Sequence, residues 1–121
     1  MRKKSPVMKA FPGAAVAPAA RSRQLAPLHP GEVLREEFLI PLGMSSGELA
    51  RACGVPRTRI ERLVNEQIGI AADTALRLGR AFGTSPEVWL NLQTDFDVQT
   101  AKHQIGKALD KIAPVPVKIA L

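Results

Sequence analysis

The sequence contains little of what disulfide-bonded, zinc-binding or membrane-spanning proteins need. Cys53 is the single cysteine among 121 residues, which excludes an internal disulfide and a cysteine-based zinc site and fits a reducing compartment such as the cytoplasm. No apolar run approaches the roughly 20 residues that cross a bilayer. Tyrosine is absent and aromatic residues make up 4% of the chain, whereas β-sandwiches and barrels depend on aromatic and β-branched side chains. The composition therefore predicts an all-α protein without a membrane segment.

Acidic residues are missing from the first 27 residues, which carry six basic residues and so account for the net charge of +6. This Ala- and Pro-rich stretch cannot bury enough apolar surface to offset the entropy cost of ordering, so residues 1–27 are expected to form a disordered basic arm. Residues 28–121 hold 11 basic and 11 acidic residues. Within this part of the chain, residues 28–50 have a net charge of −3 and residues 51–80 have a net charge of +3. A local basic surface of this kind can bind phosphate on a neutral domain, although a solvated surface of mixed charge is the alternative.

Proline, serine and glycine mark the expected ends of helices from Leu28 onward. Proline is favoured in the first helical turn, serine accepts from the free N–H groups there, and glycine adopts the left-handed conformation that ends a helix. Ser45 and Glu48 have the spacing of a capping box, and so do Thr84 and Glu87, with a proline between them. These signals predict helices that begin near Pro30, Ser46, Pro56, Asp73 and Pro86. The first helix is expected to end at Pro41 and Gly43, and the next three are expected to end near Gly54, Asn65 and Gly83.

Apolar residues recur at spacings of three and four between Val98 and Ile112, which predicts an amphipathic helix. Because Gly106 weakens the pattern, this helix is either a continuation of the fifth helix or a sixth. It either completes the core of a domain spanning residues 28–97 or packs against its counterpart in a dimer. Residues 98–121 are therefore set apart as a C-terminal amphipathic helix and tail, and a role in dimerisation is one hypothesis for them. The last residues, Val115–Leu121, are expected to form either a tail or a short strand.

The stretch from Ser46 to Asn65 has the pattern of a helix-turn-helix. Gly54 supplies the turn between two helices, and the small Ala50 lets them approach closely. Ile60, Leu63 and Val64 share one face of the second helix, which is the face that a core would bury. The side chains left outside this face are those of Arg57, Thr58, Arg59, Glu61 and Arg62. An ordinary helical hairpin with a solvated arginine face is the alternative to DNA binding.

The residues outside the buried face suit contacts with DNA. A recognition helix places its N-terminal side chains against base edges in the major groove. Arginine donates two hydrogen bonds to guanine O6 and N7, and threonine contacts either base edge, so Arg57, Thr58 and Arg62 are expected at bases. Arg59 is expected to lean toward phosphate. Asn65, with the loop after it, is expected to hold phosphate through its side chain and backbone N–H groups.

Several other residues are interpreted as structural. Trp89, Leu92 and Phe96 lie at helical spacing, which is typical of core packing. Cys53 falls on the apolar side of its helix and is expected to be a buried thiol. Neither histidine has a cysteine or histidine at metal-ligand spacing, and the acids form no recognisable catalytic pair. No enzyme activity, metal or cofactor is therefore expected.

Four blocks of the sequence, in order, resemble one known family. They are His29–Leu34, the helix-turn-helix of residues 46–65, Asp73–Leu78 and Gly83–Gln93. Together they resemble the HigA-type antitoxins, a branch of the Xre-like helix-turn-helix regulators, and the run from Thr84 to Gln93 is particularly specific to this branch. The resemblance implies a lambda-repressor-like DNA-binding domain of five helices, with a sixth left open by the C-terminal stripe.

The resemblance also implies function and partners. HigA-type antitoxins are homodimers that bind a palindromic operator in double-stranded DNA, repress their own promoter and block HigB, a small basic mRNA endonuclease of RelE type. By position, the resemblance implies DNA contacts from four residues of the recognition helix and from Ser46, which falls where the wider group often has a glutamine used on phosphate. The four are Arg57, Thr58, Arg59 and Arg62. Two alternatives stay open: a stand-alone Xre-family regulator without a toxin, and a protein-binding module that no longer uses DNA.

Overall fold

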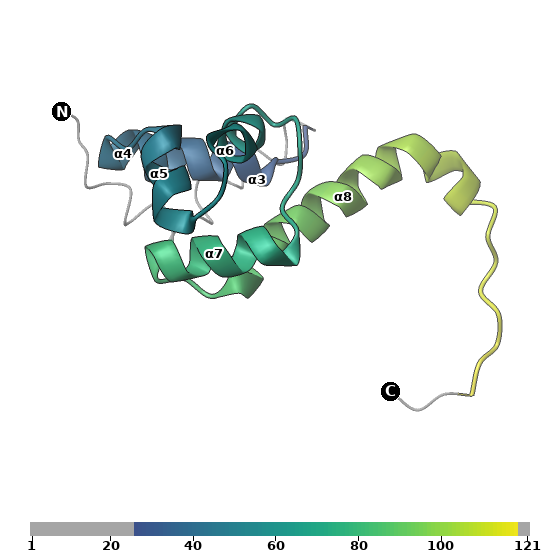
Figure 1. The fold of residues 1–121 in the computed structure, drawn as a ribbon. Coiled ribbons are helices and arrows are strands. Elements are labelled where there is room, and N and C mark those ends of the chain that lie inside the picture. The colour runs from purple at the N-terminus through teal and green to yellow at the C-terminus, as the bar shows by residue number, and fades with distance from the viewer. Residues whose placement is uncertain (1–25, 119–121) are drawn as a thin grey trace.

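The computed structural model describes residues 26–118, and these residues form helices and connecting segments without a β-strand. Five helices follow one another along the chain (Figure 1). The first runs over residues 30–42 and is made of α3 (Pro30–Val33), the π-helical segment η1 (Leu34–Leu39) and α4 (Ile40–Leu42); the others are α5 (Ser46–Cys53), α6 (Arg57–Val64), α7 (Ala72–Phe82) and α8 (Pro86–Leu109). The prediction of an all-α fold is confirmed. The expected basic arm lies outside the described residues, apart from its last two positions.

Within this described part, no helix combines the length and the apolar character that crossing a bilayer requires. The segment after α8, from residue 112 to residue 118, has no regular secondary structure. Of the two outcomes left open for the C-terminus, the described residues form a tail and not a strand.

The first helix continues through Pro41 instead of ending there. Proline has no N–H, and its ring collides with the carbonyl four residues earlier in an α-helix. Here the turn before Pro41 is widened, since the N–H of Ile40 donates to the carbonyl of Arg35, five residues back. The helix then ends at Gly43, which takes a left-handed φ of 63°. The glycine stop predicted from the sequence is confirmed, whereas the proline is accommodated by the π-helical turn.

One core lies between the first helix, α5, α6, α7 and the start of α8. Its largest apolar side chain, Trp89, is fully buried, and the rings of Phe38 and Phe82 flank it at centroid distances of 5.1 and 6.3 Å. The structural interpretation of Trp89 is confirmed. The other large apolar side chains that are fully buried are Leu34, Leu49, Ile60, Leu63 and Leu78.

The start of α8 differs from the expected capping box. Ser85, and not Thr84, occupies the N-cap position, where its hydroxyl accepts from the N–H of Val88. The hydroxyl of Thr84 instead accepts from the indole N–H of Trp89 at 2.9 Å. A buried indole N–H without an acceptor costs free energy, so Thr84 satisfies the one polar atom of this side chain.

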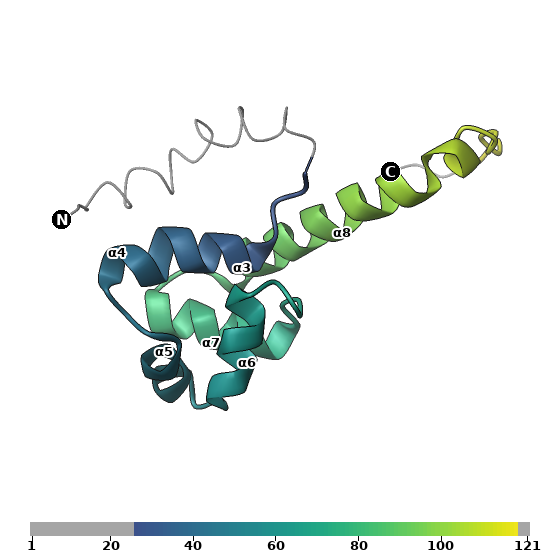
Figure 2. The same cartoon turned by 90° about the horizontal axis from the view of Figure 1, so that it is seen from above.

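Helix α8 extends well beyond the other helices (Figure 2). It runs from Pro86 to Leu109 with a kink at Ile105, where the backbone angles are non-helical. The stripe that begins at Val98 therefore continues the fifth helix as far as this kink, and Ile112 lies beyond the end of α8. Ile105, Leu109 and Ile112 are 48%, 41% and 68% exposed. The expectation that this stripe completes the core is therefore wrong for a single copy of the chain, because the core closes near Phe96.

Candidate nucleic-acid interface

The two helices of the helix-turn-helix begin and end where local chemistry places them. Ser45 accepts from the N–H of Glu48, and the Glu48 carboxylate accepts from the N–H of Ser45, which completes the predicted capping box. Gly54 ends α5 with a left-handed φ of 70°, a conformation that costs little only for glycine. Pro56 is the N-cap of α6 in an extended conformation, so the helix starts one residue later than expected, at Arg57.

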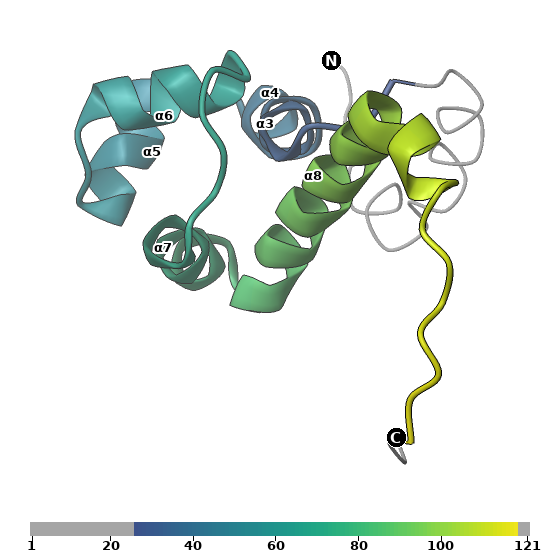
Figure 3. The ribbon, with the colours of Figure 1, turned by 90° about the vertical axis from the view of Figure 1, so that its right-hand side faces the viewer.

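The buried and exposed faces of α6 agree with its sequence pattern. Ile60, Leu63 and Val64 are buried in the core. Arg57, Thr58 and Arg62 are exposed, and so is Asn65 at the end of the helix. Figure 3 shows α5 and α6 together at one edge of the molecule, on the side away from the projecting part of α8. The residues predicted to meet base edges therefore share a surface that is open to a partner.

Arg57 lies beside the start of α5. Its guanidinium Nε donates to Glu61 one turn further along α6 at 2.8 Å, and its side chain is 71% exposed. A Cβ placed on Gly47 would lie 3.7 Å from Cδ of Arg57 and 3.9 Å from Nη1 of Arg51. The guanidinium of Arg51, from the last turn of α5, and the side chain of Arg57 thus both lie near Gly47, the neighbour of the half-buried Ser46 in the first turn of α5. Cations and free backbone N–H groups in one place favour phosphate.

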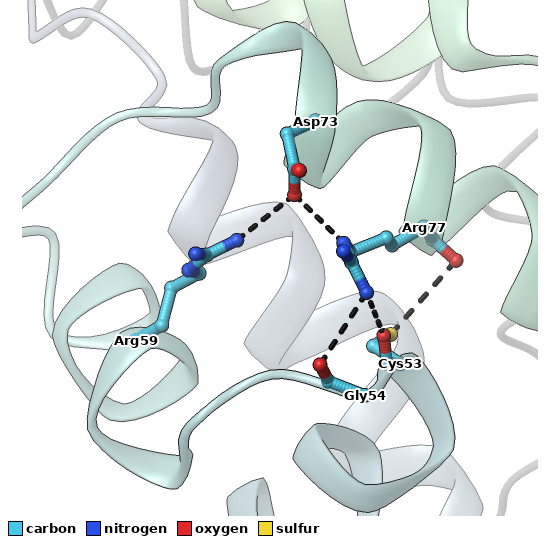
Figure 4. A network of polar contacts seen from close by, with 5 residues as sticks. All are labelled: Cys53, Gly54, Arg59, Asp73 and Arg77. Atoms are coloured by element: carbon cyan, nitrogen blue, oxygen red, sulfur yellow. Dashed lines mark hydrogen bonds and ion pairs between the residues drawn. The ribbon is translucent and has the colours of Figure 1, made fainter.

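Arg59 has a different environment from the other arginines of α6. Its Nη1 donates to Asp73 Oδ1 at 2.9 Å, and Arg77 Nε donates to the same oxygen at 2.7 Å (Figure 4). Arg77 also donates through Nη1 to the carbonyl oxygens of Cys53 at 2.7 Å and Gly54 at 3.4 Å. The hydrogen bonds from Arg77 and then Arg59 hold the pKa of Asp73 below its usual value. The network joins α6 and α7 to the turn of the helix-turn-helix.

Side chains from the first helix and from α8 contact the end of α6 and the loop that follows it. Arg35 of the first helix donates to the carbonyl oxygen of Val64 and lies 3.4 Å from a carboxylate oxygen of Glu66. Gln93 of α8 accepts from the N–H of Ile70 at 2.7 Å. These side chains fix the loop after the recognition helix. Sequence patterns gave no signal for them, because each contact joins residues more than 20 positions apart.

His29 also acquires a role that its sequence position did not indicate. It is buried, its Nδ1 accepts from the N–H of Gly31 at 2.9 Å as the N-cap of α3, and its ring meets Phe96 at a centroid distance of 4.7 Å. Burial lowers its pKa from 6.5 despite nearby carboxylates. Cys53 is buried as predicted, and burial raises the pKa of its thiol. Both side chains belong to the packing of the domain.

The arrangement defines a class of protein: a helix-turn-helix domain with an exposed basic recognition helix. The helix-turn-helix family matches residues 34–89. Two similar proteins are virulence-associated protein I of Dichelobacter nodosus, 46% identical over 79% of this chain and 88% of that protein, and antitoxin HigA-1 of Vibrio cholerae, 33% identical over 82% and 93%. Pseudomonas aeruginosa antitoxin HigA, solved with the higBA promoter, is 45% identical with a TM-score of 0.71 over 74% of this chain and 99% of that one.

The chain belongs to the HigA branch of the helix-turn-helix proteins, which confirms the resemblance inferred from the sequence. A second solved relative, antitoxin GraA in complex with its operator, is 44% identical with a TM-score of 0.71 and covers 75% of this chain and 93% of that one. The family is one of DNA-binding regulators. The roles of individual residues in DNA contact stay predictions, namely those of Ser46, Arg57, Thr58, Arg59, Arg62 and Asn65.

Proposed function

We propose that this chain is a cytoplasmic antitoxin of a type II toxin–antitoxin module, which binds a palindromic operator in its own promoter and neutralises a HigB-like mRNA endonuclease of RelE type. The exposed arginine face of α6 carries this proposal, because the opposite face is anchored in the core and the N-terminus of α5 lies beside Arg57. Relatives solved with promoter or operator DNA support the DNA partner. The relatives named as antitoxins support the toxin partner.

Base contacts are assigned to Arg57, Thr58 and Arg62, and phosphate contacts to Ser46 and Asn65. Arg57→Ala and Arg62→Ala are each expected to weaken operator binding by ~1–3 kcal/mol, because a guanidinium that reads guanine is lost. The loss on random DNA should be smaller. Arg80→Ala is the matched control, since Arg80 is an exposed arginine on α7, outside the helix-turn-helix. Equal losses on operator and random DNA would assign these arginines to the DNA backbone.

The DNA assignment itself is tested by salt. Affinity for the chain's own promoter should fall linearly on a log–log plot against salt concentration, with a slope near −0.9 for each phosphate contacted. Binding that is absent, or independent of salt, would leave a protein-binding module. Promoter binding by a chain with no toxin gene beside its own gene would leave a stand-alone regulator.

The toxin assignment has a separate test. The product of the neighbouring gene should stop growth when expressed alone and should copurify with this chain when the two are expressed together. Coexpression should restore growth even with Arg57→Ala and Arg62→Ala combined, since the proposal separates DNA reading from toxin binding. Continued growth arrest with both wild-type proteins present would contradict the antitoxin role.

A homodimer is proposed because a palindromic operator needs two copies related by a two-fold axis. The exposed stripe on α8, which includes Ile105 and Leu109, supports this assembly. Truncation of α8 after Asn91 would remove Gln93 and Phe96, which contact Ile70 and His29. The better test is Ile105→Asp with Leu109→Asp, followed by light scattering. A shift from dimer to monomer is expected, and an unchanged dimer would remove α8 as the interface.

A further inference from the structure

We propose that Asp73 is a positioning residue for operator recognition. Arg59, Asp73 and Arg77 form a set of contacts, here called the Asp73 bracket, that fixes recognition helix α6 against α7 and the turn. In this assignment Arg59 contributes to specificity through Asp73 and makes no contact of its own with DNA. The inference rests on the proposed DNA-binding function.

The contacts of the Asp73 bracket connect the three helices α5, α6 and α7 (Figure 4). Asp73 Oδ1 accepts from Arg59 of α6 at 2.9 Å and from Arg77 of α7 at 2.7 Å. Arg77 then reaches the carbonyl oxygens of Cys53, the last residue of α5, and of Gly54. A single carboxylate oxygen therefore links the recognition helix, the helix before it and the turn that joins them.

The electrostatics of helix ends favour each part of the bracket. Asp73 lies in the first turn of α7, where the free N–H groups favour a negative charge. The guanidinium of Arg77 reaches from α7 to the C-terminal end of α5, where carbonyl groups favour a positive charge. A single exposed ion pair changes an equilibrium by only about fivefold at most. Hydrogen bonds from a charged guanidinium to carbonyl groups are stronger. Here they come from Nη1 of the same guanidinium whose Nε makes the ion pair with Asp73.

Positioning and charge predict opposite effects for Asp73. If only charge mattered, removing a carboxylate from a DNA-binding surface would strengthen binding to any DNA, because phosphate repels it. If the bracket positions α6, removing Asp73 weakens binding to the operator alone, because base contacts tolerate only small displacements whereas phosphate attraction does not depend on them. Whether operator affinity falls or rises when Asp73 is removed therefore distinguishes the two explanations.

The experiment measures affinity of the full chain for its own promoter and for random DNA at several salt concentrations. Asp73→Ala is expected to lower promoter affinity about 5- to 10-fold, with random-DNA affinity unchanged or raised. Asp95→Ala is the matched control, since Asp95 is an exposed acid on α8 outside the bracket, and it should leave the ratio of the two affinities unchanged. Thermal denaturation of each variant ensures that binding is measured on folded protein.

The second variant in this experiment replaces Arg59. Arg59→Ala should lower promoter affinity by about the same factor as Asp73→Ala, and the double variant should lose no more than either single variant, because both act through one contact. The slope of promoter affinity against salt concentration on a log–log plot should be the same for Arg59→Ala as for the wild type. A slope smaller by about 0.9, with equal loss on random DNA, would make Arg59 a phosphate contact and overturn the assignment.

The outcomes distinguish this inference from the function on which it rests. A wild-type chain that fails to bind its own promoter overturns both. A wild-type chain that binds, with an Asp73→Ala variant that binds the promoter as tightly or more tightly, overturns the bracket alone. A loss confined to the promoter, shared by Asp73→Ala and Arg59→Ala and absent from Asp95→Ala, supports it.

Discussion

Replacing Gly31 with alanine should destabilise the whole domain. Gly31 lies in the first turn of α3 against the backbone of α6, where an added Cβ would overlap the carbonyl oxygen of Leu63 and lie 2.9 Å from its carbon. Non-bonded heavy atoms pack at about 3.5–4.0 Å, so relieving the overlap with the oxygen would require the two helices to separate by more than about 1 Å. The position of the Cβ is fixed by the backbone of α3, and the atoms it meets belong to the backbone of α6, so no side-chain rotation can relieve the contact.

The magnitude follows from two opposing effects. Overpacking of a well-packed site costs about 1–3 kcal/mol, and alanine in place of glycine in a helix returns at most about 1 kcal/mol. Because the clash at Gly31 is with backbone, we expect a net loss of about 2 kcal/mol in the free energy of unfolding. With a slope near 1 kcal/mol per molar urea, the denaturation midpoint followed by circular dichroism should fall by about 2 M at unchanged slope.

Gly47→Ala is the matched control for this prediction. The added Cβ at Gly47 would lie 3.7 Å from Arg57 Cδ, which is ordinary contact. The substitution should therefore be neutral or stabilise by up to about 1 kcal/mol through helix propensity. A Gly31→Ala protein as stable as the wild type, or an equal loss in Gly47→Ala, would refute the role assigned to the close approach of α3 and α6.

Two further predictions concern buried polar groups. Thr84→Val should lower the free energy of unfolding by about 1–2 kcal/mol, because the indole N–H of Trp89 loses its acceptor, and Thr84→Ser should restore it in thermal denaturation; equal stability of the valine and serine variants would contradict this. Burial lowers the pKa of His29 from 6.5, so the unfolded chain takes up a proton at this residue more readily than the folded chain does. The stability of the fold is therefore highest above pH 6.5 in this respect and falls as the pH drops below that value. Urea denaturation between pH 7.5 and 5.5 should show this loss, and His29→Asn should flatten it; an equally steep loss in the variant would point to other groups.

Helix ends were predictable from the sequence because their causes are local. The capping box of Ser45 and Glu48 lies within four residues, and Gly54 needs only its own backbone freedom to end α5. The outward face of α6 was predictable for a similar reason, since helical period alone separates Ile60 and Leu63 from Arg57 and its exposed neighbours. Both inferences use spacings shorter than one helix.

Contacts between distant segments were not predictable in this way. Thr84 was expected to cap α8, but its hydroxyl is used by Trp89, whose position depends on how the whole core packs. Arg59 and Asp73 lie 14 residues apart, and their pairing depends on the angle between α6 and α7. Asp73 and Arg77 have the four-residue spacing of a helical ion pair, and this was the one local signal that the network left in the sequence.

The way α6 is held has a consequence for how much of the chain is needed to read DNA. The segment shared with the wider helix-turn-helix family, residues 34–89, omits Gly31, whose missing side chain lets α3 reach α6, and Gln93, which ties down Ile70. A recognition helix grafted into another protein with only its own turn would lose these supports. The orientation of α6 therefore depends on the whole helical domain and would not be preserved if the helix-turn-helix motif alone were transferred.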